Sequence, residues 1–270
     1  GEAVKADLTV TFQYLKKAHL LYPGKEYCGR VYLRDVGIEN YGICAETAFT
    51  YEKEEAKNLL PQRKTSGHKG TFGKVLLYAG SREMSGAALL CARAVLCSGA
   101  GMLKVLTEET NHTLLRTVLP EAMIATDPVK DLEWADVLVA GPGIGTSEEA
   151  KETLTGLLRA SHLPTVLDAD ALNLLAEDQE LMELVREKAS KQPVILTPHP
   201  GEFLRLSGLT MADYQQEREK TIRTLQEQCH CVLVSKDACT LVTDGAALYL
   251  NSTGNDGMAA AGSGDVLTGV

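Results

Sequence analysis

The sequence lacks the features that mark two large classes of proteins. Its 27 lysines and arginines are outnumbered by 36 aspartates and glutamates, which leaves a formal net charge of −9. A protein whose main partner is nucleic acid needs a basic excess to neutralise phosphates, although a local hollow on an acidic protein still binds a small anion. No apolar run is long enough to span a membrane, and no apolar segment after a basic start marks a secretory signal. We therefore expect neither a nucleic-acid partner nor a membrane.

Cysteine is scarce and odd in number, with seven residues in the chain. Most of them lie in apolar runs such as Leu90-Cys91-Ala92. This usage predicts reduced, buried thiols of a cytoplasmic protein rather than a disulfide framework. The pair in Cys229-His230-Cys231, which we place in an extended segment, has no second ligand pair nearby in the sequence, so we do not expect a zinc site there.

Three stretches of different character divide the chain. Residues 1–43 contain short β-like runs at 8–12 and 30–33, too few for a core of their own, and we interpret them as the tail of a preceding domain. Residues 44–66 are more polar and predict a linker with a lead-in helix. Residues 67–270 form the main domain. The chain begins without methionine and stops inside a helix-like run, so both ends read as cuts and the main domain as incomplete at its C-terminus.

Within the main domain, apolar runs alternate with helix-like segments. The predicted strands cover residues 75–79, 103–106, 135–140, 165–167, 193–196, 232–234, 240–242 and 247–250, and the predicted helices cover 86–99, 108–118, 147–160 and 212–228. Apolar strands alternating with helices are typical of an α/β fold with a mostly parallel sheet covered on both faces. Because the last three strands follow one another closely, we expect an antiparallel meander at that edge.

Ligands of open α/β sheets bind beyond the carboxyl ends of the strands, so the residues just after each strand are the candidate site. The loop at 80–88 has neither a Walker A nor a dinucleotide-binding glycine pattern, and its small residues admit either a ligand or a closely packed helix. The segment Gly141-Pro142-Gly143-Ile144-Gly145 feeds a capped helix. Its amides fit a phosphate or a sugar, or its glycines only shape a turn.

Polar side chains follow the next two strands. Asp168 and Asp170 stand one residue apart and can orient a metal or a polar ligand, although the role we expect of Asp170 is that of a helix N-cap. His199 lies between two prolines, in a stiff loop that fixes its direction, and this favours a functional histidine. Glu202 can hold Mg²⁺ through water, since Mg²⁺ bound to phosphates keeps several waters.

The last forty residues carry the densest glycine pattern. Lys236 follows a strand and is either a phosphate neutraliser or a solvated lysine. Residues 251–258 are rich in small and amide side chains, which predicts a backbone nest for phosphates. Gly262-Ser263-Gly264-Asp265 precedes a helix-like run, where amides and a helix N-terminus favour a transferring phosphoryl group. Asp265 would accept a proton from a hydroxyl there, unless it is only the helix N-cap.

Together these loops resemble the NAD(P)HX dehydratase family over about residues 52–270. The segments that carry the resemblance are 67–75, Gly141-Pro142-Gly143-Ile144-Gly145, 167–173, Thr197-Pro198-His199-Pro200-Gly201-Glu202 and the glycine pattern of 254–265. The resemblance implies a ribokinase-like, three-layer α/β/α sandwich with a mostly parallel central sheet. Residues 1–43, through 6–12 and Tyr22-Pro23-Gly24, resemble the end of the NAD(P)HX epimerase domain. That Rossmann-like domain is fused ahead of the dehydratase in many bacterial proteins, so a short remnant of it is expected here.

Members of this family repair hydrated nicotinamide cofactors. The resemblance implies a lyase that dehydrates S-NADHX or S-NADPHX to NADH or NADPH at the expense of ADP, giving AMP and phosphate, with Mg²⁺. Eukaryotic members use ATP, and the fused arrangement favours ADP here. Asp265 is implied as the base, and the amides of residues 262–264, among them those of Gly262 and Gly264, as the anion hole.

The resemblance also implies two sets of binding residues. Ala87, Gly143 and His199 are expected to contact the hydrated dinucleotide. The expected contacts of the adenine nucleotide are Lys236, Asp237, Ala238, Cys239, Thr240, Asn255 and Gly264.

Two other functions stay open from the sequence alone. A ribokinase-like kinase for a vitamin-precursor alcohol would use the same base and anion hole, and a non-catalytic nucleotide-binding module would keep only the scaffold. The His-Pro-Gly-Glu loop and the epimerase-like segment favour the dehydratase. We expect a homo-oligomer, with the family's helices beyond Asp265 supplied by a separate C-terminal fragment. Epimerase activity is expected of a native fusion protein, not of this chain.

Overall fold

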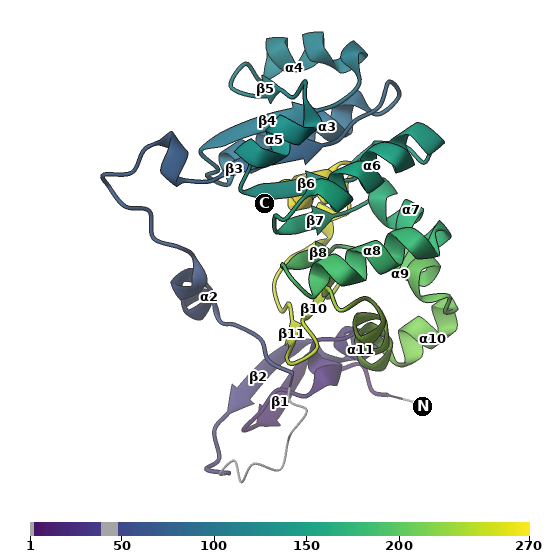
Figure 1. The fold of residues 1–270 in the computed structure, drawn as a ribbon. Coiled ribbons are helices and arrows are strands. Elements are labelled where there is room, and N and C mark those ends of the chain that lie inside the picture. Colours follow the sequence, from purple (N-terminus) through teal and green to yellow (C-terminus); the bar gives the residue numbers. More distant parts are fainter. Residues whose placement is uncertain (1–2, 39–47) are drawn as a thin grey trace.

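A nine-stranded sheet organises the computed structural model, which describes residues 3–38 and 48–270 (Figure 1). Its strand order is β11-β10-β9-β8-β7-β6-β3-β4-β5. The strands are β3 (Lys74–Tyr78), β4 (Met102–Leu106), β5 (Met123–Ile124), β6 (Val137–Ala140), β7 (Thr165–Leu167), β8 (Val194–Leu196), β9 (Val232–Ser235), β10 (Leu241–Thr243) and β11 (Leu248–Leu250). Only β10 runs antiparallel to its neighbours, so both the mostly parallel sheet and the antiparallel meander at its edge are confirmed.

Helices cover both faces of this sheet, which makes the three-layer sandwich of a ribokinase-like fold. They are α3 (Ser85–Cys97), α4 (His112–Val118), α5 (Pro128–Trp134), α6 (Glu148–Ala160), α7 (Asp170–Glu177), α8 (Gln179–Ala189), α9 (Pro200–Ser207), α10 (Met211–Gln216), α11 (Arg218–Cys229) and α12 (Ser263–Gly269). Neighbouring strand residues point to opposite faces. Leu76 and Leu138 belong to the core under α6, α7, α8 and α11, whereas Leu77 and Val139 belong to the core under α3 and α4.

The N-terminal segment forms a small unit of its own beside this sheet. Strands β1 (Leu8–Phe12) and β2 (Arg30–Arg34) pair in parallel and are joined through α1 (Gly24–Cys28). The short strands expected in this segment are therefore present. The helix α2 (Lys53–Leu59) extends away from the sheet in Figure 1, where a lead-in helix is expected. The domain limits at 43 and 66 stay predictions, and the first of them lies outside the described residues.

The predicted helix over 212–228 is wrong as one element. The backbone leaves the helical region at Glu217 (φ −134°, ψ 48°), which separates α10 from α11. The break accompanies two inward contacts: the Tyr214 ring lies 5.0 Å from that of Phe203, and Arg218 turns toward the carbonyl of Cys239. No glycine or proline marks this break in the sequence.

The cysteine prediction is confirmed in part. Cys91, Cys229, Cys231 and Cys239 are buried thiols, but Cys97 is exposed and Cys28 is partly exposed, while Cys44 lies outside the described residues. The expected extended segment around 229–231 is also wrong, because α11 ends there and His230 adopts a left-handed conformation (φ 57°). Apolar neighbours in a sequence do not decide which side of a helix faces solvent.

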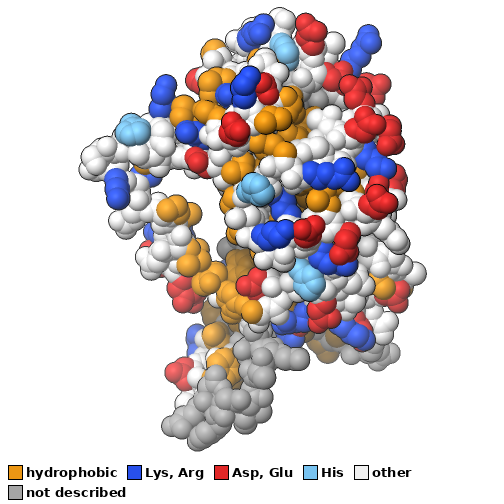
Figure 2. Space-filling model, viewed as in Figure 1, with side chains coloured by type: hydrophobic (Ala, Val, Ile, Leu, Met, Phe, Trp, Pro, Cys, Tyr) orange, Lys and Arg blue, Asp and Glu red, His pale blue; other side chains and the backbone are white. Residues whose placement is uncertain are grey.

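The surface agrees with the charge balance of the sequence. Figure 2 shows acidic and basic side chains intermingled over the visible face of the body, with hydrophobic side chains gathered along the gap between the body and the α2 arm. In the described part of the chain, no helix is both long and apolar enough to cross a membrane.

Candidate functional site

The order of the strands creates a switch point between β3 and β6. The chain runs from β3 outward to β4 and β5, then returns to place β6 on the other side of β3. Loops at the carboxyl ends of two strands that lead away in opposite directions leave a crevice between them, which is where open α/β sheets bind ligands. The loops singled out from the sequence therefore meet at one edge of the sheet.

Three glycines shape the loop that follows β6. Gly141, Gly143 and Gly145 all have positive φ (130°, 65° and 76°), a region that side chains other than glycine rarely adopt. A Cβ on Gly143 would lie 2.7 Å from the Cβ of Met84 and 2.8 Å from that of Ala87. The structure thus brings Gly143 and Ala87 together, and their contact with a dinucleotide stays a prediction.

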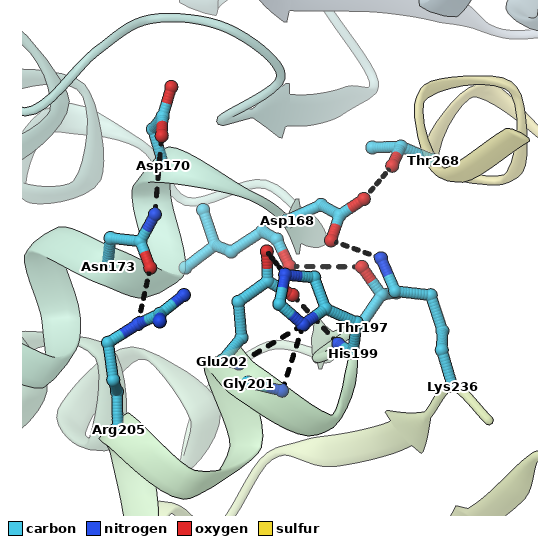
Figure 3. Close-up of polar contacts among 11 residues, drawn as sticks. Asp168, Asp170, Asn173, Thr197, His199, Gly201, Glu202, Arg205, Lys236 and Thr268 are labelled. Atoms are coloured by element: carbon cyan, nitrogen blue, oxygen red, sulfur yellow. Dashed lines mark hydrogen bonds and ion pairs between the residues drawn. The ribbon is translucent and has the colours of Figure 1, made fainter. Parts of the chain in front are cut away.

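Asp168 lies at the centre of the edge, where β7 ends (Figure 3). Its side chain is almost fully buried. One carboxylate oxygen lies 2.7 Å from Nζ of Lys236, and the other accepts a hydrogen bond from the hydroxyl of Thr268. Asp168 is therefore occupied by contacts within the chain rather than open to a metal.

The expected N-cap role of Asp170 is wrong. Ala169, with φ 50°, occupies the cap position of α7, and Asp170 is the first residue of that helix. The Asp170 carboxylate instead accepts a hydrogen bond from the Gly145 amide at 2.9 Å and one from Nδ2 of Asn173 at 3.3 Å. It acts as a brace between the loop after β6 and the start of α7, a long-range contact that local sequence does not reveal.

His199 and Glu202 form a reciprocal cap at the start of α9. Nδ1 of His199 accepts hydrogen bonds from the amides of Gly201 and Glu202, so the other nitrogen carries the proton. That nitrogen lies 3.1 Å from Oε1 of Glu202, while Oε2 accepts the His199 amide at 2.8 Å. The imidazole is half exposed and the Glu202 carboxylate is buried. These contacts fix the orientation of the ring at the start of α9, as Figure 3 shows.

Asp265 lies in the first turn of α12. This helix directly follows Gly262, whose backbone is left-handed (φ 84°). Within the described part of the chain, the amides of Gly264 and Asp265 make no hydrogen bond. Burial raises the pKa of the Asp265 carboxyl above its ordinary value; repulsion by Asp168 and Asp170 adds to the rise, and Lys236 opposes it. A carboxylate with a raised pKa beside unpaired amides is equipped to accept a proton next to an anion.

The residues expected to contact an adenine nucleotide fall into two groups. A Cβ on Gly264 would lie 3.7 Å from Nζ of Lys236, so these two residues are neighbours. Asn255 shapes its own loop, since its side chain accepts the Gly257 amide and caps a short 3-10 helix. Its role toward a nucleotide stays a prediction.

The other group is the turn of 236–240 between β9 and β10. Cys239 is buried and its thiol donates to the carbonyl of Asn251, so its side chain points into the core. Asp237 points toward Arg218, with 3.4 Å between Oδ2 and the guanidinium. The side chain of Cys239 is therefore not available to a ligand in this arrangement, and the contacts expected of the other residues of this turn stay predictions.

Sequence reasoning missed Arg218 and Thr268. Arg218 is buried, donates to the carbonyl of Cys239 at 3.0 Å and lies 5.1 Å from the centre of the Tyr214 ring. Its position in a charged segment indicates only a solvated helix. Thr268 follows Asp265 by three residues, which places both on one side of a helix, and this spacing was the one available signal.

The described residues contain no preformed metal site. Among the described residues, no group of three or more histidine, cysteine, aspartate or glutamate side chains is arranged to hold a metal ion. Because both oxygens of Glu202 already bond to His199, its remaining lone pairs fit a metal only through water. The Mg²⁺ role of Glu202 stays a prediction.

Comparisons with known proteins agree with this geometry. A family model described as NAD(P)H-hydrate dehydratase matches residues 75–270. Bifunctional NAD(P)H-hydrate repair enzymes of Coxiella burnetii and Moorella thermoacetica are 38% and 36% identical to the chain over its whole length. The chain covers 55% and 53% of these two proteins, and so spans about half the length of the curated relatives it matches.

Solved structures show the same fold. An ADP/ATP-dependent NAD(P)H-hydrate dehydratase from Bacillus subtilis, co-crystallised with ATP and Mg²⁺, superposes with a TM-score of 0.69 at 32% identity, over 84% of this chain and 79% of that one. A ribokinase-like superfamily protein from Enterococcus faecalis superposes with a TM-score of 0.72 at 28% identity, over 86% and 80% of the two chains.

Proposed function

The chain belongs to the NAD(P)H-hydrate dehydratase family, and from this premise we propose that it returns hydrated nicotinamide dinucleotides to NADH and NADPH. The observation that carries the proposal is Asp265, a partly buried carboxylate beside Lys236 and the unpaired amides of Gly264 and Asp265. We propose S-NADHX and S-NADPHX as substrates and ADP as the phosphoryl donor. The sequence of steps below follows from these groups.

Asp265 takes the proton from the hydroxyl of the hydrated ring, and the freed oxygen attacks the terminal phosphorus of ADP. The bond from that phosphorus to the bridging oxygen breaks and AMP leaves. The new carbon–oxygen–phosphate group is a good leaving group, so the carbon–oxygen bond then breaks and phosphate departs. Loss of a proton from the neighbouring ring carbon restores the double bond of the dihydropyridine. The net result is that the hydrated ring loses one water while one phosphoanhydride bond of ADP is cleaved.

The protein's part in these steps is positioning and charge stabilisation. The amides of Gly262 and Gly264 and the Lys236 ammonium offset the charge that develops on the transferred group, whereas the expected third amide, that of Ser263, already donates to the carbonyl of Ala260. Ala87, Gly143 and His199 hold the hydrated dinucleotide, while Gly264, Asn255 and the turn of 236–240 hold the adenine nucleotide. Mg²⁺, reached through water from Glu202, would neutralise charge on the nucleotide phosphates.

The remaining proposals concern the protein in its cell. Buried thiols such as Cys91 support a cytoplasmic location, because reducing compartments keep cysteines unpaired. The bifunctional relatives support residues 1–43 as part of an epimerase domain. We further propose that the protein is a homo-oligomer and that a separate C-terminal fragment of the same protein supplies the helices that complete the nucleotide site.

The direct test is recovery of NADH absorbance from S-NADHX with ADP or with ATP, in the presence of Mg²⁺. We expect nucleotide-dependent recovery with one phosphate released for each NADH formed, and a higher rate with ADP. The Bacillus subtilis dehydratase serves as the positive control for the substrate preparation. If that control is active and this chain, assembled with its C-terminal fragment, forms no NADH, the proposal is wrong. A phosphorylated alcohol without phosphate release would instead support the kinase.

Arg218 supplies a second prediction, because it holds the turn proposed to contact the nucleotide. Arg218→Lys keeps the charge but cannot bond Asp237 and the carbonyl of Cys239 together, since an ammonium lacks the planar fork of a guanidinium. We expect the KM for the nucleotide to rise by about tenfold, the effect of one lost charged hydrogen bond, with kcat nearly unchanged. Steady-state kinetics with varied ADP measure this.

The matched control is Arg186→Lys, on α8 and far from the turn in sequence. Its Nε donates to the carbonyl of Gln228 and its guanidinium pairs with Glu183, so it too makes one backbone contact and one ion pair. Equal changes in KM for the two variants would show that Arg218 does not act through the turn.

A further inference from the structure

The steps above leave one buried charge unused. Asp168 is 1% exposed, yet it neither accepts the substrate proton nor faces the solvent. Burying a carboxylate is costly unless it is paired and hydrogen-bonded. Each of its two oxygens has one partner, Lys236 from the end of β9 and Thr268 from α12. A buried carboxylate that costs so much free energy, at a candidate active site, needs a physical explanation.

These contacts join three parts of the chain that are distant in sequence. Lys236 is 68 residues and Thr268 100 residues away from Asp168. Thr268 lies one helical turn after Asp265, so a hold on its hydroxyl is also a hold on the turn that carries Asp265. Within the described residues, this is the hydrogen bond by which a side chain of α12 reaches the loop after β7, although the same hydroxyl also lies 3.0 Å from the carbonyl oxygen of Gly264 in its own helix. The hydroxyl of Ser263 bonds only to the nearby carbonyl of Ala260.

Another side of α12 packs against α3, and no hydrogen bond joins these two helices among the described residues. A Cβ on Gly269 would lie 2.4 Å from the backbone oxygen of Cys91 and 2.7 Å from the Cβ of Ala94, so α12 packs closely on α3. Close packing of this kind fixes the distance between the two helices, but it supplies no hydrogen bond that specifies the rotation of α12 about its axis. The hydroxyl–carboxylate contact of Thr268 supplies the missing direction, because charge-assisted hydrogen bonds are strong and depend on geometry.

We propose that Asp168, Lys236 and Thr268 form a positioning clamp, in which Asp168 holds α12 through Thr268 and keeps the Lys236 ammonium beside Gly264. The clamp rests on the proposed function, since its purpose is to place the base and the cation on either side of one transferring phosphoryl group. Asp168 and Thr268 act through Asp265 and Lys236, and are positioning residues.

The clamp also sets the charge around the base. The groups that face Asp265 are the carboxylates of Asp168 and Asp170, the Lys236 ammonium and, from α3, the thiol of Cys91. Burial raises the pKa of that thiol, and the carboxylates of Asp265 and Asp168 raise it further, so it stays protonated. Removing the charge of Asp168 lowers the pKa of Asp265, and removing that of Lys236 raises it.

The first test removes the hydroxyl of Thr268 and keeps its shape. In Thr268→Val we expect kcat to fall about ten- to hundredfold, the effect of losing a hydrogen bond to a charged group, with the KM for ADP within about threefold of wild type. Thr268→Ser keeps the hydroxyl and should restore kcat to within about threefold. Thr165→Val is the matched control, since it removes a buried hydroxyl, bonded to the carbonyl of Leu163, from the other end of β7.

Hydrogen exchange of the same variants needs no substrate and separates the clamp from the proposed reaction. We expect the amides of α12 to exchange at least about tenfold faster in Thr268→Val and at the wild-type rate in Thr165→Val and Thr268→Ser. Unchanged exchange in α12 would overturn the clamp. Absence of turnover in the wild type would overturn the proposed function instead, and the exchange result would still decide the clamp.

The pH profile gives a readout that simple loss of stability does not produce. The base must be ionised, so turnover rises with pH through the pKa of Asp265. In Asp168→Asn the like charge is gone, and we expect the acid limb to move to lower pH by roughly one unit. In Lys236→Met the cation is gone, and the limb should move to higher pH. Shifts in the same direction, or none, would overturn the clamp.

Discussion

Replacing Asp265 with asparagine should lower turnover of S-NADHX by about 10²- to 10⁴-fold, the usual contribution of a general base. Asparagine fills the same volume and keeps a polar group at the start of α12, but it has no lone pair basic enough to take a proton from a hydroxyl. Because the raised pKa of Asp265 reflects an unfavourable burial of its charge, the neutral residue should not destabilise the helix. Nucleotide affinity should therefore stay within a few-fold of wild type, as measured by calorimetric titration.

Asp256→Asn is the control for this substitution. Asp256 is an exposed aspartate shortly before α12, and within the described residues its side chain makes no hydrogen bond or ion pair. We expect it to turn over at the wild-type rate. If Asp265→Asn also keeps full turnover, Asp265 is not the base, and the proposed reaction needs another proton acceptor in the crevice.

Gly141→Ala should have the largest effect on stability of any single methyl group added near the site. Gly141 has φ 130°, and a Cβ there would lie 1.8 Å from the backbone oxygen of Asp168 and 2.9 Å from the Cβ of Ala171. The first contact is with a backbone atom, which cannot rotate out of the way as a side chain can. Backbone strain and overpacking each cost about 1–3 kcal/mol, so we expect a loss of about 3 kcal/mol and a melting temperature lower by roughly 6–12 °C.

Gly156→Ala provides the opposite case in the same chain. Gly156 lies within α6, has no other atom within 4 Å of an added Cβ, and lacks a positive φ. Alanine there should stabilise the protein by about 0.5–1 kcal/mol, because glycine loses more conformational freedom on folding. A melting temperature of Gly141→Ala equal to that of Gly156→Ala would show that the loop after β6 adapts freely.

The helices and strands of the fold could be predicted from the sequence because the interactions that produce them are local. Apolar runs such as the one at 75–79 are buried on both faces in a parallel sheet, and this alone predicts their conformation and their alternation with helices. The three glycines of 141–145 were predictable as a turn, and all three adopt the left-handed conformations that glycine permits. The motif at 262–265 likewise marks the start of a helix where it stands.

Side-chain partners were decided by the tertiary structure. Asp168 was recognisable as a polar residue at a strand end, but its pairing with Lys236 and Thr268 depends on β7 and β9 lying on either side of β8 and on α12 returning across them. Asp170 was predicted as a cap and instead bonds the Gly145 amide. The local preference of Asp170 for a helix cap was overridden because another loop brings the Gly145 amide close to its carboxylate.

The helix break at Glu217 and the inward turn of Arg218 were likewise decided by the tertiary structure. Charge at helical spacing indicates a solvated face, yet the guanidinium of Arg218 lies buried against the carbonyl of Cys239. Periodicity reports which residues share a face of their own element, so the sequence by itself determined the strands, the glycine turns and the chemistry available at the sheet edge. The order in which strands assemble fixes which faces meet, and only the tertiary structure decided which of those groups bind one another.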